Sequence, residues 1–166
     1  ADVGNVVAIT GDIHAFFAST PWDMRDPSKK IPEFVGGAIS SATYGDLLFR
    51  QASADPTLSA AGAPALAATL ESFLTNSNPN PNPWLAYAET DEHGFVVVDA
   101  DSSTFNVAFY QASQGLVQSR VTDAAELQSE FETIKFKVDA GSPEIYRDFD
   151  GTWRRWDSEA IEYVDA

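Results

Sequence analysis

The feature that most constrains this chain is an apolar run near its start that ends at a glycine, an aspartate and a histidine. The run, Val6–Ile9, shows no alternation of polar and apolar residues, a pattern typical of a strand covered on both faces of its sheet. Gly11 follows, and we expect a tight turn there because glycine accepts a positive φ without a steric penalty. Asp12 and His14 therefore lie just beyond the carboxyl end of a strand, where open α/β sheets place their chemistry.

Two interpretations of this Asp-x-His pair are open from the residues alone. Aspartate and histidine are common metal-binding or catalytic groups, but a histidine beside a strand end is also often a hydrogen-bonded structural residue. Glu33 is a candidate for a carboxylate that orients a metal-bound His14, or for a solvated charge at a strand edge. His93, within Asp91–Gly94, can contact a metal or a substrate, although a capping or hydrogen-bonding role is the more conservative interpretation.

Length and composition favour a single globular domain. The chain has 166 residues, of which 44% are hydrophobic and 12% aromatic, enough to bury a core. No apolar run approaches the roughly 18 residues that a membrane-spanning helix needs. This chain also has no basic segment followed by an apolar one, the pattern that would indicate a signal peptide. Only a few residues precede the predicted interior strand, so we expect further sequence upstream.

The charge and the lack of cysteine exclude several classes of function. The 25 acidic residues against 10 basic ones give a net charge of −15, which argues against nucleic acids and anionic membrane surfaces as partners. A chain this acidic needs local positive charge to handle an anionic substrate, and metal ions are the usual source. Without cysteine there is no disulfide and no zinc–thiolate site.

The first half of the chain is predicted to hold two short strands and one amphipathic helix, separated by loops. In chain order after His14 we expect a loop at 21–32, a short strand at 31–36, small residues that allow a close backbone approach at 36–41, loop with at most one turn of helix at 42–63, a helix at 64–76 and an extended Asn-Pro connector at 78–83.

The second half is predicted to be mainly β. The expected strands are 95–99 and 105–111, joined as a hairpin, and 134–138. Asp123 and Glu126 have the spacing of a helix capping box. Trp153 and Trp156 are expected to cover a hydrophobic edge rather than to bind a ligand. The whole pattern favours an α/β fold class with some α+β character.

The other acidic motifs are weaker candidates for a metal site. Asp99 and Asp101 can bind calcium, but hairpin turns favour aspartate anyway because its side chain caps backbone amides. Asp148–Gly151 lacks the third acidic position and the bidentate glutamate of an EF-hand. A dinuclear metal centre needs about six or more protein ligands. Two histidines and no cysteine do not readily supply them, so residues outside this chain would have to complete such a site.

Several short motifs occur in a characteristic order along the chain. They are Val7–His14, Pro32–Gly36, Ile39–Ser41, Asn82–Pro83 and Asp91–Phe95. Taken together they resemble the C-terminal part of the PhoD-like (alkaline phosphatase D) family of metallophosphoesterases. Order and approximate spacing agree from residue 5 to about residue 111, and the strand near Phe136 also fits. Gly-Asp-x-His alone is a weak signal, but its combination with Glu-Phe-Val and Ser-Ser is fairly specific.

This resemblance implies a metal site and a reaction. Asp12 and His14 would be metal ligands, and His14 a catalytic residue, as in the family's closing Gly-Asp-x-His motif. The family uses iron (Fe3+) with calcium (Ca2+), other divalent metals being possible. It hydrolyses phosphomonoesters and phosphodiesters, some members act as phospholipase D, and a secreted or periplasmic location is implied. The chain departs from the family at Trp84, where histidine is frequent, and it lacks the family's upstream aspartate, cysteine, tyrosine and asparagine ligands.

We therefore expect residues 1–166 to form the C-terminal half of a metallophosphoesterase-like layered β-sandwich with flanking helices, within one catalytic domain. The upstream part would be missing or lie on a separate chain. With that complementary N-terminal segment the chain would hydrolyse phosphate esters, and Glu33 and His93 would support the ligands. Two alternatives are a phospholipase D-type phosphodiesterase of the same family, and a non-catalytic acidic module that binds a partner through its exposed edge and tryptophan surface. Neither a nucleic acid partner nor a transmembrane anchor is expected.

Overall fold

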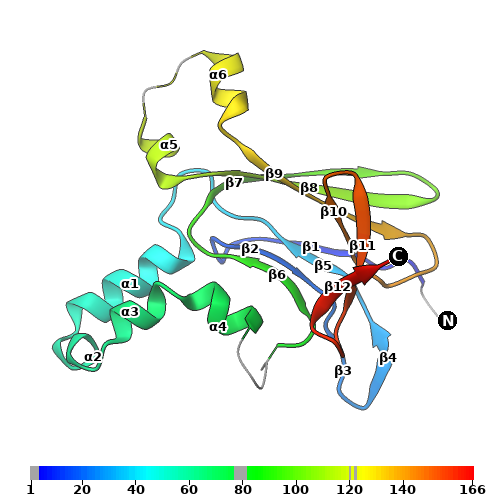
Figure 1. The fold of residues 1–166 in the computed structure, drawn as a ribbon, viewed down its shortest axis with the longest axis horizontal. Helices are drawn as coiled ribbons and strands as arrows, with labels where there is room; N and C mark the ends of the chain where they lie inside the picture. Colours follow the sequence, from blue (N-terminus) through cyan, green and yellow to red (C-terminus); the bar gives the residue numbers. More distant parts are fainter. Residues whose placement is uncertain (1–3, 77–81, 120, 122) are drawn as a thin grey trace.

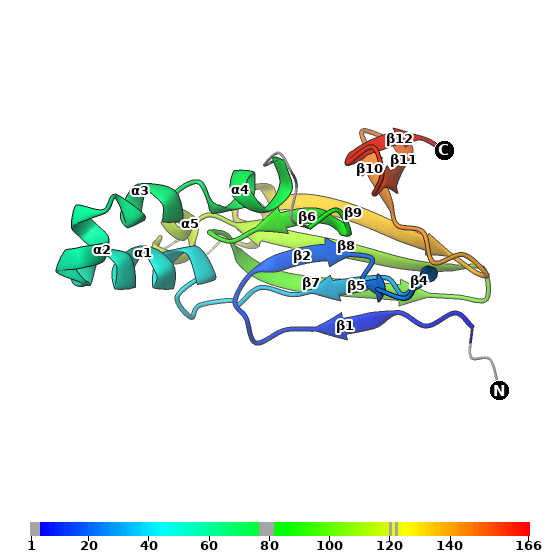
Figure 2. The ribbon, with the colours of Figure 1, turned by 90° about the horizontal axis from the view of Figure 1, so that it is seen from below.

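A computed structural model describes residues 4–76, 82–119, 121 and 123–166, and it shows two sheets packed as layers with helices at one end (Figures 1 and 2). The predicted α/β layered sandwich is thereby confirmed. None of the described helices is long and apolar enough to span a membrane.

The first sheet has four strands and contains the N-terminal apolar run. In the order β1-β5-β2-β6, its strands are β1 (Ala8–Thr10), β5 (Glu33–Val35), β2 (Phe16–Ser19) and β6 (Leu85–Glu89). β1 runs parallel to β5, and the other two pairings are antiparallel. This sheet therefore places the end of β1 beside the end of β5.

The second sheet has six strands, all paired antiparallel in the order β12-β11-β10-β9-β8-β7. They are β7 (His93–Ala100), β8 (Thr104–Ala112), β9 (Glu132–Asp139), β10 (Tyr146–Phe149), β11 (Thr152–Asp157) and β12 (Glu162–Asp165). The predicted hairpin and the predicted third strand are thus β7–β8 and β9. Figure 2 shows that β10–β12 turn away from the plane of β7–β9, and side chains of β10 and β12 contact Tyr87 and Ala86 of β6.

Aromatic side chains from both sheets form the core. Phe16 and Phe34 come from the first sheet and Phe109 and Phe136 from the second, and all four are fully buried. Ring centroids lie 5.2 Å apart for Phe16–Phe109 and 5.7 Å apart for Phe34–Phe136. The alternation of buried and more exposed residues along β8 and β9 is what the sequence predicted, because successive side chains of a strand point to opposite faces.

The prediction of a mainly unstructured segment at 42–63 was wrong. This segment forms α1 (Tyr44–Ala54) and α2 (Pro56–Ala60). Their amino ends are capped by Thr43 and Asp55, whose side chains accept hydrogen bonds from backbone amides of the first turn. Such caps stabilise short helices whose apolar pattern is weak.

The predicted helix at 64–76 is divided into α3 (Ala63–Ala67) and α4 (Leu70–Asn76). Its apolar face is not buried, since Leu66 is 58% exposed and Phe73 51%. Beyond the hairpin, α5 (Gln114–Gln118) precedes α6 (Ala124–Ser129), which Asp123 caps as predicted. The Asn-Pro connector lies mostly outside the described residues, at 77–81.

Two further predictions about the N-terminal third need correction. The run Val6–Ile9 does not form a strand covered on both faces: Val6 is 42% and Ile9 46% exposed. Among the described strands β1 pairs only with β5, so it lies at an edge of its sheet. The expected loop at 21–32 contains a hairpin of β3 (Trp22–Asp23) and β4 (Asp26–Lys30).

Glycines hold the two sheets close together beside β1, as the small-residue segment at 36–41 predicted. A Cβ atom on Gly37 would overlap the ring of Phe16, and one on Gly36 would lie 2.9 Å from Cγ2 of Val96. Gly94 has φ of +145° and its amide donates to the carbonyl of Ala38 at 3.0 Å. The segment and β7 are therefore in direct backbone contact.

We expect Gly94→Ala to destabilise the fold by about 3 kcal/mol, because its Cβ would combine an unfavourable φ with overlap at the Tyr110 carbonyl. Denaturant unfolding followed by far-UV circular dichroism measures this. Gly115→Ala in α5 is the matched control, since its Cβ would meet nothing closer than 3.7 Å, and it should change stability by less than about 1 kcal/mol. Equal stability of the two variants would contradict the proposed role of Gly94.

Candidate functional site

Asp12 and His14 directly follow β1, and both adopt left-handed backbone conformations. Their φ angles are +75° and +60°. Gly11, where we expected the left-handed turn, is not among the glycines with positive φ. Aspartate and histidine tolerate this conformation better than most residues, but each still costs about 1 kcal/mol or more. Two strained positions on either side of Ile13 therefore coincide with the two candidate ligands.

The imidazole of His14 is oriented by a backbone carbonyl. Its Nδ1 lies 2.8 Å from the carbonyl oxygen of Ala42, and because a carbonyl only accepts, Nδ1 carries the proton. In the neutral ring this leaves the lone pair on Nε2 available to a metal. The His14 carbonyl accepts a hydrogen bond from the amide of Tyr44 at 2.9 Å, so the first turn of α1 also holds this residue.

A shallow cavity of about 420 Å³ contains both residues. It lies between the edge strand β1 and the edge strand β7, with glycines 36, 37 and 94 in its wall. The apolar part of the wall comes from Ile9, Ile39, Phe95 and Val96. Within the described part of the chain, no group of three or more His, Cys, Asp or Glu side chains is arranged to hold a metal ion.

Glu33 is not brought to His14. It opens β5 opposite Ala8, whereas the candidate ligands follow the other end of β1. Its Oε2 accepts a hydrogen bond from the Ser19 hydroxyl at 3.1 Å. The carbonyl of Ala42 takes the orienting position that we expected Glu33 to fill. No sequence pattern identifies a backbone carbonyl that will orient a histidine. The small-residue segment at 36–41, which directly precedes Ala42, was nevertheless recognised from the sequence.

His93 lies at the start of β7 and is only 4% exposed. The cavity wall includes its neighbour Gly94 but not His93 itself. Its Nδ1 atom is buried without a hydrogen-bond partner, so the expected hydrogen-bonding role is not found for that atom. His14 thus follows β1 while His93 begins β7, and of the two only His14 lines the cavity.

The acidic turn motifs are structural, as predicted for the hairpins. Asp101 Oδ1 accepts hydrogen bonds from the amides of Ser103 at 2.6 Å and Thr104 at 2.8 Å. Hydrogen bonds from these residues lower the pKa of Asp101 to about 2. Asp148 Oδ1 accepts from the amide of Gly151 at 2.7 Å in the β10–β11 turn.

A group of acidic residues that the sequence did not single out surrounds the end of β6. Burial, followed by repulsion from nearby carboxylates that include Glu71, raises the pKa values of Glu89 and Asp91. Burial also raises the pKa of Glu92, with Glu132 as the next cause. A carboxyl group whose pKa is raised by folding binds a proton more readily in the folded protein than in the unfolded chain. These three groups therefore favour folding more as the pH falls through their folded-state pKa values.

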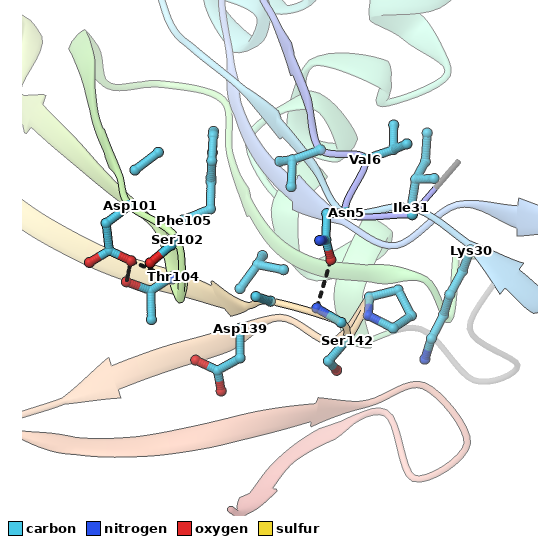
Figure 3. A pocket seen from close by; sticks show the side chains of 17 residues that line it. Asn5, Val6, Lys30, Ile31, Asp101, Ser102, Thr104, Phe105, Asp139 and Ser142 are labelled. Carbon is cyan, nitrogen blue, oxygen red and sulfur yellow. Dashed lines mark hydrogen bonds between the residues drawn. The ribbon is translucent and has the colours of Figure 1, made fainter. Parts of the chain in front are cut away.

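A second cavity lies at the opposite end of β1 (Figure 3). Its volume is about 370 Å³, and Asp12, His14, Glu33 and His93 do not line it, whereas Asp101 does. Asn5 (φ +57°) accepts a hydrogen bond through Oδ1 from the amide of Gly141 at 2.6 Å, drawn as a dashed line in Figure 3. This contact ties the segment before β1 to the loop after β9. Of the two tryptophans of the tail, Trp156 covers protein surface as predicted: it is buried, and its indole donates to the Pro83 carbonyl at 3.0 Å.

Comparison with known proteins gives one match. A family model described as PhoD-like phosphatase matches residues 1–109. This range includes β1, Asp12, His14 and both walls of the cavity that they line. No curated protein and no solved structure gives a significant match to the chain.

We expect Asp12→Gly to leave stability unchanged or to raise it, and Asp12→Ala to lower it by about 1 kcal/mol, because only the alanine side chain is strained at the φ of +75°. Thermal unfolding of both variants checks this. Asp148→Ala and Asp148→Gly form the control pair, since Asp148 is not among the positive-φ residues, and there glycine should be the less stable variant. If alanine equals glycine at residue 12, the backbone there is not strained.

Proposed function

The chain belongs to the PhoD-like phosphatase family, and on this premise we propose that it takes part in the metal-dependent hydrolysis of phosphate esters. One observation supports the proposal most: Asp12 and His14 line the same cavity, and the Ala42 carbonyl leaves Nε2 of His14 free to bind a metal. The family points to phosphoester hydrolysis in general; the metals, the substrate and the location are the finer parts of the proposal.

Asp12 and His14 fit a metal-binding role. A carboxylate oxygen and a neutral imidazole nitrogen together suit iron and the divalent transition metals, and the carboxylate also suits calcium. We propose Fe3+ with Ca2+ as the metals, as the family resemblance implies. Bound metal would polarise the phosphoryl oxygens, neutralise the charge of the substrate and lower the pKa of the attacking group. His14 would act through the metal, in the tautomer that Ala42 selects.

We propose further that a complementary segment of the same enzyme docks along β1 and completes the ligand set. Two ligands are fewer than the six or so that a dinuclear centre requires. Ile9 of β1 is 46% exposed, and Val6 and Ile13 in the segments that flank the strand are 42% and 41% exposed. No described strand pairs with the outer side of β1. A free apolar edge strand is a site for the addition of another strand. Such a strand would cover this edge next to Asp12 and His14.

A second candidate function is hydrolysis of diesters with apolar groups, of the phospholipase D type. Ile39 is 68% and Phe95 39% exposed in the wall of the cavity. An apolar wall beside the proposed metal ligands favours an ester with an apolar organic group over a polyanionic substrate. Parallel assays with 4-nitrophenyl phosphate, bis(4-nitrophenyl) phosphate and phosphatidylcholine vesicles distinguish the two functions.

As for location, we propose that the enzyme is secreted or periplasmic, in line with the family resemblance.

We expect Asp12→Asn and His14→Asn each to lower the metal content of the enzyme and to reduce kcat/KM by at least about 100-fold, because a ligand is lost. Asparagine accepts the left-handed backbone of both positions, so the fold should be retained. Elemental analysis and chromogenic ester hydrolysis are the measurements. Glu33→Gln is the control and should keep the metal, since Glu33 contacts Ser19 instead. Full metal content and activity in His14→Asn would refute the site.

Docking along β1 predicts that Ile9→Lys is harmless in this 166-residue chain, where the side chain is 46% exposed, but harmful in an enzyme that also contains the complementary segment. In that enzyme, a lysine at the interface between β1 and the complementary segment should lower the melting temperature by several degrees and reduce the metal content. Leu58→Lys, at a residue 46% exposed on α2, is the matched control. Equal melting temperatures of the two lysine variants in that enzyme would exclude docking at β1.

A further inference from the structure

Arg147 of β10 is a charged residue without a carboxylate partner. Among the described lysines and arginines, the others form ion pairs with aspartate or glutamate, apart from Lys135, which is exposed. Arg147 has no such pair, and its Nε atom is buried without a hydrogen-bond partner. In a chain with 25 acidic and 10 basic residues, a partly buried arginine that forms no ion pair with a described carboxylate is unexpected, since buried charge is costly unless compensated.

Aromatic rings from both sheets surround the guanidinium group. Its Cζ atom lies 5.1 Å from the ring centroid of Tyr87 on β6, 4.9 Å from that of Phe149 and 6.0 Å from that of Tyr163 on β12. These distances allow cation–π attraction. No described residue accepts a hydrogen bond from the in-plane N–H groups, which form the fork that binds oxyanions.

The two tyrosines cannot supply the missing negative charge. Burial raises the pKa of Tyr87 to about 12, and burial also raises the pKa of Tyr163. Both phenols therefore stay neutral at physiological pH. Their hydroxyl groups donate elsewhere, to Gln111 Oε1 at 2.9 Å and to the Ala86 carbonyl at 3.0 Å.

Arg147 lines a cavity of about 360 Å³ that is separate from the one at Asp12 and His14. Its wall includes Tyr87, Trp156 and Tyr163, and it shares no residue with the cavity at β1. Glu162 is the one carboxylate among the described lining residues; it is exposed and forms no ion pair with Arg147. The cavity thus offers one cation, flat apolar walls and one acidic side chain.

We propose that this cavity is a binding site for a small organic monoanion, an apolar or aromatic carboxylate. The guanidinium N–H groups would donate to the two carboxylate oxygens in a bidentate pair. The organic part would pack against the indole of Trp156 and the phenol rings. A single arginine beside Glu162 favours a monoanion over a doubly charged phosphate, because the second charge would be repelled without compensation.

The test is a titration of the isotope-labelled 166-residue chain with benzoate, followed by NMR. The indole Nε1–H signal of Trp156 should shift saturably, while the indole signals of Trp22 and Trp153, which do not line this cavity, should not. Arg147→Met keeps the packing on the three rings but removes the charged donors. It should weaken benzoate binding about tenfold or more. Glu162→Gln should tighten binding, since it removes the repelling carboxylate.

Arg154→Met is the matched control. Arg154 is the register partner of Arg147 on β11, and its Cζ lies 5.5 Å from the same Phe149 ring, but it is paired with Asp165. Its loss should leave benzoate binding unchanged. If Arg147→Met fails to fold, Arg147→Lys supplies the comparison: it keeps the charge, loses the fork and should also bind benzoate more weakly.

Three results would overturn the proposal. One is a Trp156 signal that does not respond to benzoate, and another is unchanged binding in both Arg147 variants, which would make Arg147 a packing residue only. The third is tighter binding of inorganic phosphate than of benzoate at Trp156, which would contradict the monoanion. Weaker binding of acetate than of benzoate would support the role of the aromatic walls. Since Asp12 and His14 lie elsewhere, an inactive site at β1 would not affect this outcome.

Discussion

The contact between the phenylalanine rings of the two sheets is the interaction on which the rest of this structure depends. Phe16 and Phe34 from one sheet meet Phe109 and Phe136 from the other, all fully buried. Aromatic pairs in such tilted arrangements contribute about 1 kcal/mol beyond the burial of their area. Because β2 and β5 carry the first two rings, the same contact fixes the position of β1, which is hydrogen-bonded to β5 alone among the described strands.

The candidate site uses this rigidity at the point where β1 ends. The glycines at 36, 37 and 94 allow the backbone after β5 to approach β7 closely. The chain then runs on to Ala42, whose carbonyl selects the tautomer of His14. Asp12 and His14 both have a left-handed backbone, and hydrogen bonds with Ala42 and Tyr44 hold His14 in place. Strain of this kind is found where a site needs side chains in fixed directions.

Charge is unevenly distributed over the fold, as the surroundings of β6 show. Carboxylates gather around the end of β6, where burial raises the pKa values of Glu89, Asp91 and Glu92. Two residues before Glu89, on the same face of the strand, Tyr87 contacts the guanidinium of Arg147. Strand β6 thus has carboxylates with raised pKa values at its end and a ring in contact with a cation nearer its start.

Much of this was determined by the sequence itself. Alternation predicted β7, β8 and β9, since the period of two survives in any half-buried strand, and the motifs around Asp12 and His14 identified the family that the comparison confirmed. Helices α1 and α2 were missed because their stability rests on the caps at Thr43 and Asp55 more than on an apolar period. Only the tertiary structure decided that Ala42 rather than Glu33 orients His14, that His93 lies outside the cavity, and that Arg147 lacks an acidic partner. The physical reason is the same for all three: each depends on distances between segments far apart in the chain, which local residue patterns do not encode.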